Sequence, residues 1–208
     1  MKGLFITFEG GEGAGKSTQS KLLYEYLLKF EIPVLLLREP GGTPIGEKIR
    51  SIIIDPENSE MLSVTEALLY AAARAQLVSQ VIKPALSEGK IVICDRYIDS
   101  SFAYQAFGRG LGLDAIEKIN SYAIGGLWPD ITFYMRLSPE IGFRRKKGTV
   151  FDRLEKENSE FHRLVFEGFE KAADIYKERF RPINADASER EIHETIIDIV
   201  NQLIKPIK

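Results

Sequence analysis

The chain has 208 residues, a length that fits one domain, and 44% of them are hydrophobic, which is enough to bury a sizeable core. The 28 basic and 30 acidic residues nearly balance, which argues against a general nucleic-acid or membrane-surface binder, because such proteins need a basic excess. The single cysteine, Cys94, excludes an intramolecular disulfide, and the first apolar run is too short for a signal peptide or a membrane span. We therefore expect a cytoplasmic protein.

Apolar and amphipathic segments alternate along the chain. A first strand is predicted at 3–9, followed by a glycine-rich turn and a helix from about Lys16 to Phe30. Further strands are predicted at 33–38, 91–94, 131–137 and 183–185, and helical segments at 45–54, 62–87, 99–106, 113–125, most of 139–181 (with a break near Gly148) and 188–204. This alternation indicates an α/β fold, with a central parallel sheet of about five strands and helices on both faces.

Three of the predicted strands end in polar residues. These ends carry Glu9 to Lys16, Arg38 to Pro40, and Asp95 to Arg96. In open α/β sheets, ligands bind at the carboxyl ends of the strands. We therefore expect the three segments to converge in space and to form one site.

The first of these ends carries a phosphate-binding motif. Residues 10–17 read Gly-Gly-Glu-Gly-Ala-Gly-Lys-Ser and match G-x-x-x-x-G-K-[ST], between a predicted strand and a predicted helix as the motif requires. Glycines tolerate positive φ, so backbone N–H groups can curl around phosphate oxygens. Lys16 is expected to reach the β- and γ-phosphates of ATP, and the Ser17 hydroxyl to bind Mg²⁺. The expected ATP-binding residues are Gly10, Gly11, Glu12, Gly13, Ala14, Gly15, Lys16, Ser17 and Thr18.

Asp95 and Arg96 follow a buried strand and complete the predicted phosphate and metal site. A carboxylate in this position suits Mg²⁺, held together with Ser17, although a helix cap or a structural ion pair is an alternative for Asp95. The guanidinium of Arg96 can bind two phosphate oxygens at once, with a simple salt bridge as its alternative.

Together with the phosphate loop, three further segments make the chain resemble the thymidylate kinases, most closely the bacterial form. The segments are Arg-Glu-Pro-Gly-Gly-Thr-Pro-Ile-Gly-Glu (38–47), Tyr-Ala-Ala-Ala-Arg (70–74) and Asp-Arg-Tyr-Ile-Asp-Ser-Ser (95–101). The likeness runs in order from Phe5 to about Asn184, and Glu-Pro-Gly-Gly-Thr is its most family-specific part. It implies a three-layer P-loop NTPase fold and transfer of the γ-phosphoryl group of ATP to dTMP in dTTP synthesis. It also implies a magnesium cofactor and a homodimer.

The resemblance also assigns roles on the acceptor side. Glu12 would lie near the sugar hydroxyl, and Arg96 would hold the acceptor phosphate. Tyr70 would stack on the thymine ring and Arg74 would bond its edge; Tyr70 stands where the family usually has Phe, which keeps the stacking face. The spacing of Tyr70 and Arg74 agrees with these roles, because residues four positions apart share one face of a helix. The remaining expected substrate contacts are Glu39, Pro40, Arg50, Ser101, Tyr104 and Gln105.

The resemblance further implies a lid at about 142–156 within the single domain. Some thymidylate kinases carry an arginine inside the phosphate loop, in the slot that Gly13 occupies here. Phosphoryl transfer needs positive charge, so we expect it from the basic run 144–147 or from Arg153. Arg145 and Arg153 are our preferred candidates, and the alternative for the run is a solvated helix face.

Two other classes of function stay open from the sequence. One is a kinase for another deoxynucleotide or for a deoxynucleoside, although the arginines Arg50, Arg74 and Arg96 favour a phosphorylated acceptor. The other is a GTP- or ATP-gated switch or assembly protein. A GTP switch would need Asn-Lys-x-Asp and Asp-x-x-Gly motifs, and neither occurs in the sequence.

Overall fold

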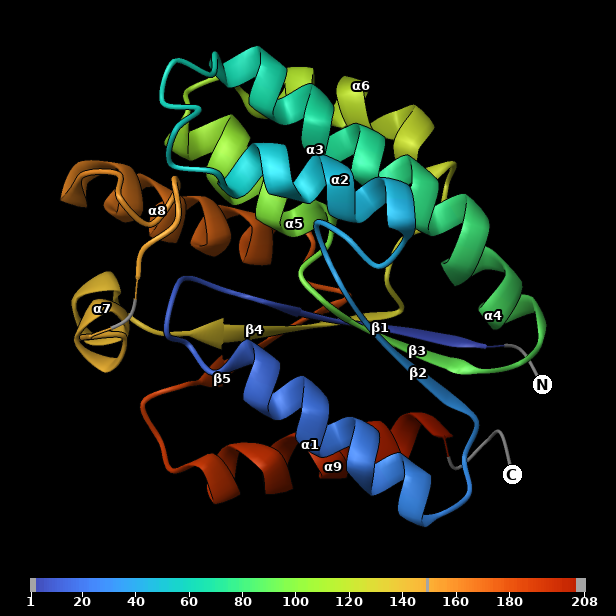
Figure 1. Ribbon diagram of the computed structural model, residues 1–208. Coiled ribbons are helices and arrows are strands. Elements are labelled where there is room, and N and C mark those ends of the chain that lie inside the picture. Colours follow the sequence, from blue (N-terminus) through green and yellow to red (C-terminus); the bar gives the residue numbers. More distant parts are fainter. Residues whose placement is uncertain (1–2, 149, 205–208) are drawn as a thin grey trace.

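A five-stranded parallel sheet forms the centre of the molecule, in the computed structural model that describes residues 3–148 and 150–204 (Figure 1). The strand order is β2-β3-β1-β4-β5, and every neighbouring pair is parallel. The strands are β1 (Leu4–Glu9), β2 (Val34–Arg38), β3 (Ile91–Asp95), β4 (Ile131–Arg136) and β5 (Phe180–Asn184).

Helices cover both faces of this sheet (Figure 1). One face carries α1 (Lys16–Lys29) and α9 (Glu189–Ile204), while α7 (Pro139–Arg145) lies beyond the end of β4. The opposite face carries α2 (Pro44–Ile54), α3 (Ser63–Leu77), η1 (Val78–Ile82), α4 (Lys83–Ser87), α5 (Ile98–Ser101), η2 (Phe102–Gly108), α6 (Leu113–Ile124) and α8 (Ser159–Ile175). The architecture is the three-layer α/β arrangement that the sequence predicts.

The central strand explains how the two apolar layers divide. All of β1 is buried, and its side chains alternate between the faces of the sheet. Leu4, Ile6 and Phe8 join the cluster under α1 and α9, whereas Phe5 joins the cluster on the opposite face. A strand buried on both faces therefore appears in the sequence as a continuous apolar run.

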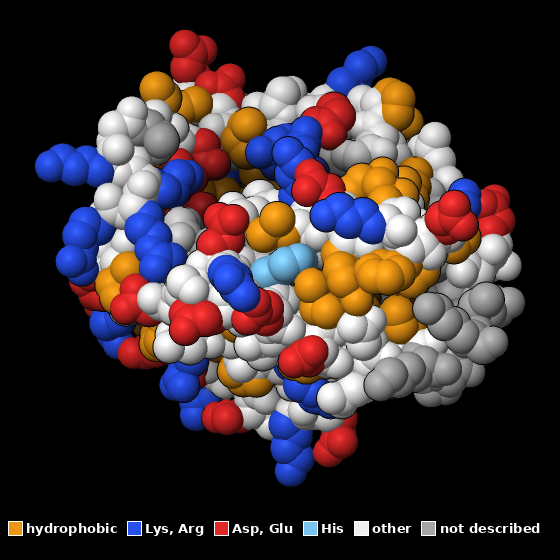
Figure 2. Space-filling view, turned by 90° about the horizontal axis from the view of Figure 1, so that it is seen from below, with side chains coloured by type: hydrophobic (Ala, Val, Ile, Leu, Met, Phe, Trp, Pro, Cys, Tyr) orange, Lys and Arg blue, Asp and Glu red, His pale blue; other side chains and the backbone are white. Residues whose placement is uncertain are grey.

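Some apolar side chains remain uncovered on the α1 and α9 face. Figure 2 shows a group of hydrophobic side chains beside a histidine on this face, with charged side chains of both signs around it. The exposed large hydrophobic residues here are Leu28 of α1, Phe30 directly after α1, and Leu203 of α9. In residues 3–148 and 150–204, no helix is both long enough and apolar enough to cross a membrane.

The break predicted near Gly148 within 139–181 is present, but the break is longer than expected and the last strand begins earlier. Between α7 and α8 the described residues form turns and irregular chain, and α8 begins only where the Asn158 side chain accepts a bond from Phe161 N at 2.8 Å. The last strand starts at Phe180, three residues earlier than expected. It is an edge strand paired only with β4 and contains Pro182, so it lacks the apolar run that marks a central strand.

The sheet register brings the predicted site segments together. Asp95 lies opposite Phe8 in β1 and opposite Arg38 in β2, so three strands end at the same level. Arg96 N then donates to Phe8 O at 2.9 Å, which extends this pairing by one residue. The carboxyl ends of β1, β2 and β3 thus form one edge, as we expected from the topology.

Candidate functional site

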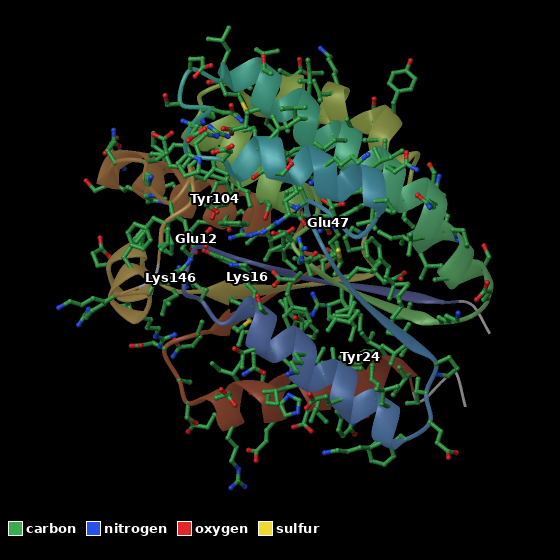
Figure 3. The ribbon with its side chains drawn as sticks, in the orientation of Figure 1. Glu12, Lys16, Tyr24, Glu47, Tyr104 and Lys146 are labelled. Carbon is green, nitrogen blue, oxygen red and sulfur yellow. The ribbon has the colours of Figure 1, made fainter. Side chains whose placement is uncertain are left out.

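Two cavities open at this edge of the sheet and share a wall. One, of about 440 Å³, follows the phosphate loop, and the other, of about 150 Å³, lies under α2, α3 and η2. Figure 3 shows Glu12, Lys16, Tyr104 and Lys146 gathered at this end of the molecule, with Tyr24 far along α1. The residues that line both cavities are Glu12, Glu39, Arg50 and Arg96.

The phosphate loop has the geometry that an anion site requires. Gly13 and Gly15 take φ of 67° and 85°, values that a residue with a side chain adopts only with strain. Within the described residues, no side chain caps the start of α1 and its first turn holds no acidic group, so the helix N-terminus faces the cavity unneutralised. Residues Glu12, Gly13, Ala14, Gly15, Lys16, Ser17 and Thr18 line this cavity.

Lys16 is held at the base of the loop. Its Nζ donates to Gly11 O at 2.7 Å, and the side chain is buried. Burial, aided by the positive charge of Arg96, lowers the pKa of Lys16 to about 8. The ammonium therefore still carries its proton at pH 7, and an arriving phosphate would stabilise that charged form.

Ser17 and Asp95 provide a pair of oxygen ligands suited to a magnesium ion. The Ser17 hydroxyl donates to Asp95 Oδ2, so the two side chains meet inside the larger cavity. No group of three or more His, Cys, Asp or Glu residues in the described chain could bind a metal by itself. The pair fits Mg²⁺, which usually keeps several waters and takes phosphate oxygens as further ligands.

Arg96 lies at the junction of the two cavities in an unusual backbone conformation. Its φ is 70°, in the left-handed region that costs a residue other than glycine about 1–3 kcal/mol. The guanidinium donates to Glu12 Oε1 at 2.5 Å and to Gly10 O at 3.1 Å, and Tyr104 OH donates to the same Glu12 oxygen at 2.8 Å. Burial disfavours a charged Glu12, but the charges of Arg96 and Lys16 outweigh it and lower the Glu12 pKa.

The smaller cavity combines an aromatic side chain with several polar ones. Tyr70 and Gln105 line it, and Gln105 Nε2 donates to Glu66 Oε1 at 2.9 Å, which fixes the orientation of the amide. Arg50 donates to Pro40 O at 3.1 Å from the side of α2. Its walls come from Glu12, Glu39, Pro40, Arg50, Ile54, Tyr70, Arg96, Ser100, Tyr104, Gln105, Asp152, Leu154 and Glu155.

Arg74 and Ser101 lie behind this cavity and are absent from its wall. Arg74 is buried, and its five N–H groups have partners: Glu39, Ser101, Asn120 and the Tyr97 carbonyl. Burial raises the pKa of Glu39 to about 7 even though the Arg74 guanidinium opposes the shift. In this conformation Arg74 supports Glu39 and Ser101, and contact with a base would require it to exchange one of these bonds.

The two preferred lid arginines occupy different places. Arg145 lines the larger cavity and donates to Ala185 O at 2.9 Å and to Asp186 at 3.0 Å. Arg153 is buried in a structural cluster, where it donates to Ile53 O at 2.8 Å and to Glu66 at 2.7 Å. It lines neither cavity, so the structure does not bring Arg153 to the predicted phosphate site.

Several residues of the site were missed by sequence reasoning. Lys146 lines the larger cavity, contacts Glu155 and lies 3.9 Å from Glu12, although it had been one unassigned member of a basic run. Ser100 donates to the buried Glu9 at 2.6 Å and accepts from Arg96 at 3.3 Å. Ser100 precedes Tyr104 by four residues in the predicted helix 99–106, so helical spacing was a signal that could have indicated it.

Comparisons with known proteins give the family and the fold of the chain. A family model described as thymidylate kinase matches residues 8–196 of the chain. The chain is 48% identical over 208 residues to the thymidylate kinase of Caldanaerobacter subterraneus subsp. tengcongensis, with both chains fully covered. It is 50% identical over 200 residues to that of Halothermothrix orenii, covering 94% of this chain and 95% of the relative. Its fold is similar to the crystal structure of thymidylate kinase from Ehrlichia chaffeensis, with 34% identity, a TM-score of 0.79, and coverage of 96% of this chain and 99% of that chain.

Proposed function

The chain belongs to the thymidylate kinase family, and from this premise we propose that it transfers the γ-phosphoryl group of ATP to dTMP, giving ADP and dTDP for dTTP synthesis. The observation that carries the proposal is the pair of cavities that meet at Glu12 and Arg96. One has a phosphate loop and the other an aromatic and polar lining, so a phosphate donor and a nucleotide acceptor would meet end to end.

On the donor side, backbone groups of residues 12–18 would surround the phosphates while Lys16 neutralises the β- and γ-oxygens. Ser17 and Asp95 would hold a magnesium ion, which would supply positive charge to the phosphate oxygens. No strong general base is needed, because the acceptor phosphate of dTMP is already an anion. Catalysis would then consist of positioning and charge stabilisation.

On the acceptor side, Arg96 and Arg50 are placed to bind the phosphate of dTMP, since both line the shared wall of the cavities. Tyr70 would stack on the thymine ring, while Gln105 would bond its edge. Glu12 would accept from the sugar hydroxyl, with Tyr104 beside it. We assign Arg74 and Ser101 to the support of this pocket, with direct contact only after a rearrangement of their bonds.

For the lid, we propose that Arg145 and Lys146 supply positive charge to the transferring phosphoryl group. Both line the phosphate cavity and both belong to the region 142–156 that was expected to act as a lid. Arg153 would instead anchor the end of this region to the core through Glu66 and Ile53 O. Closure of the lid would exclude water and limit hydrolysis of ATP.

We further infer a homodimer formed through α2 and α3. These helices pack side by side on the outside of the molecule, and they leave Ile45, Ile52, Val64 and Leu68 about half exposed. Such a group of apolar side chains suits a self-complementary interface. Sedimentation velocity tests this: a monomer at micromolar concentration would contradict it.

We also propose a cytoplasmic location. The thiol of Cys94 is buried and forms no disulfide, which suits the reducing environment of the cytoplasm.

The reaction is tested by measuring ADP formation from ATP and Mg²⁺ with dTMP, dUMP, dCMP, dGMP, dAMP and thymidine offered separately. We expect strong turnover with dTMP, weak turnover with dUMP and none with thymidine. The uracil nucleotide should remain a poor substrate, because loss of one methyl contact discriminates by only about 1–3 kcal/mol. Turnover with thymidine, or turnover with another monophosphate that equals or exceeds that with dTMP, would overturn dTMP as the acceptor. ATP binding without acceptor-dependent turnover would favour a nucleotide-gated binding protein.

A further inference from the structure

The phosphate loop and helix α7 touch through two glycines. A Cβ atom added to Gly13 would overlap the carbonyl oxygen of Gly142, and one added to Gly142 would overlap the carbonyl oxygen of Glu12, each closer than the 3.0 Å that real Cβ atoms keep. The obstructing atoms are backbone, so no side chain can rotate away. The two segments, about 130 residues apart in the sequence, are therefore in direct backbone contact.

This contact lies on the same side of α7 as the lid cations. Gly142, Arg145 and Lys146 stand at positions i, i+3 and i+4, which share one face of a helix. Arg145 and Lys146 both line the phosphate cavity, and Lys146 lies 3.9 Å from the carboxylate of Glu12. Figure 3 shows Lys146 beside Glu12 and Lys16 at this end of the molecule.

Residues on both sides of Gly142 pack against the rest of the protein. Ile141 packs against the core cluster under α1 and α9, and the ring of Phe143 lies 4.6 Å from that of His162 on α8, edge to face. The helix is thus held between packed side chains and the phosphate loop. The distance between α7 and the phosphate loop is set by Gly13 and Gly142, which have no side chains.

We propose that Gly142 is a positioning residue, which lets α7 dock on the phosphate loop at Gly13 and thereby places Arg145 and Lys146 over the transferring phosphates. This inference rests on the proposed role of these two cations. It also explains why a side chain at position 13 and a docked α7 exclude each other. The Cβ atom of an arginine at position 13 would clash with the backbone of Gly142, and the φ of 67° at this position would strain any residue other than glycine. A cation in the loop and cations from this helix are alternatives for steric reasons.

The test is Gly142→Ala, measured with saturating ATP and dTMP. Alanine forms helix better than glycine, so α7 itself should not be weakened. We expect kcat to fall about 10- to 100-fold, because a displacement near 1 Å at a reacting group has effects of this size, while KM for dTMP and the melting temperature change little. Glu140→Ala, on the exposed first turn of the same helix, is the matched control and should keep the wild-type kcat.

The same substitution is then made in an Arg145→Ala, Lys146→Ala background. If Gly142 acts through these cations, it should change kcat there by less than twofold. An equal fold-change in both backgrounds, or a single variant with kcat within twofold of wild type, would overturn the inference while the kinase assignment stands. If kcat is unchanged in the variant that carries both Arg145→Ala and Lys146→Ala, the proposed lid role of these residues is wrong, and the inference loses its premise.

Gly13→Ala tests the other side of the contact and covers the case in which Gly142→Ala does not fold. The other lining residues of the phosphate loop are unchanged in this variant, so ATP binding should persist. We expect the same loss of kcat, again absent in the cation-free background, and a wild-type kcat would contradict the docking of α7 on the loop.

Discussion

The two halves of the site are built in different ways. The phosphate side is built around seven consecutive lining residues at a sharp turn between β1 and α1, to which side chains from other elements add charge. The acceptor side gathers side chains from α2, α3, η2, the end of β3 and the segment 152–155. A contiguous backbone site is encoded locally, whereas a side-chain site depends on how distant elements pack.

The supporting interactions differ in the same way. Behind the acceptor cavity lie buried ion pairs, with Glu39 against Arg74 and Glu66 against Arg109 and Arg153. A buried charge is costly to leave unpaired, so changes behind this cavity should affect stability as well as substrate use. On the phosphate side, Lys16 has one hydrogen bond, to Gly11 O, and its removal should affect catalysis alone.

The largest effect should follow from Lys16→Ala on the phosphate side. We expect kcat to fall about 10²- to 10³-fold, which is the usual result of removing one preorganised charge from a transition state. The melting temperature should stay near that of the wild type. Steady-state kinetics and calorimetry measure both, and near-normal turnover would contradict the phosphate-loop assignment.

Arg96→Ala tests the junction of the two halves. Removing its charge-assisted bonds should lower kcat/KM for dTMP about 10- to 100-fold. ATP affinity, measured by titration calorimetry, should change much less, because the loop backbone holds ATP. A loss confined to ATP binding would place Arg96 on the donor side.

Glu66→Gln should show the distributed support of the acceptor side. Glu66 is buried and accepts from Arg109, Arg153 and Gln105, so its neutralisation leaves Arg153 without this counter-charge and Arg109 with Glu157 as its remaining acidic partner. We expect a loss of about 3 kcal/mol in the free energy of unfolding, with a several-fold weaker use of dTMP and little change for ATP.

Denaturant unfolding and kinetics measure these effects. Glu160→Gln is the matched control, since Glu160 pairs with Arg163 on the exposed surface of α8, where such a pair contributes little. If the two variants lost equal stability, the buried cluster would not support the acceptor cavity.

Sequence reasoning recovered the strands that are apolar runs, including β2 at one edge of the sheet, and misplaced the start of β5 at the other edge. The run from Ile91 to Cys94 is apolar because helices cover it, and this pattern is visible without a structure. The strand at Phe180 contains Arg181 and Pro182 and has no such run, so packing against β4 decides its limits. The segment between Lys146 and Asn158 has no periodicity of its own, and its course follows from anchors such as Arg153 on Ile53 O.

The predictions about the site divide in the same way, into those that depend on local sequence and those that depend on tertiary packing. The sequence alone determined the phosphate loop, the carboxylate and arginine at the end of β3, and the family of the chain, because each depends on residues adjacent in the sequence and on a strand–turn–helix context. Only the tertiary structure decided that Arg74 and Arg153 lie behind the cavities while Lys146 faces one of them. The direction of a long charged side chain is set by partners from other elements, and local spacing carries no information about where those partners lie.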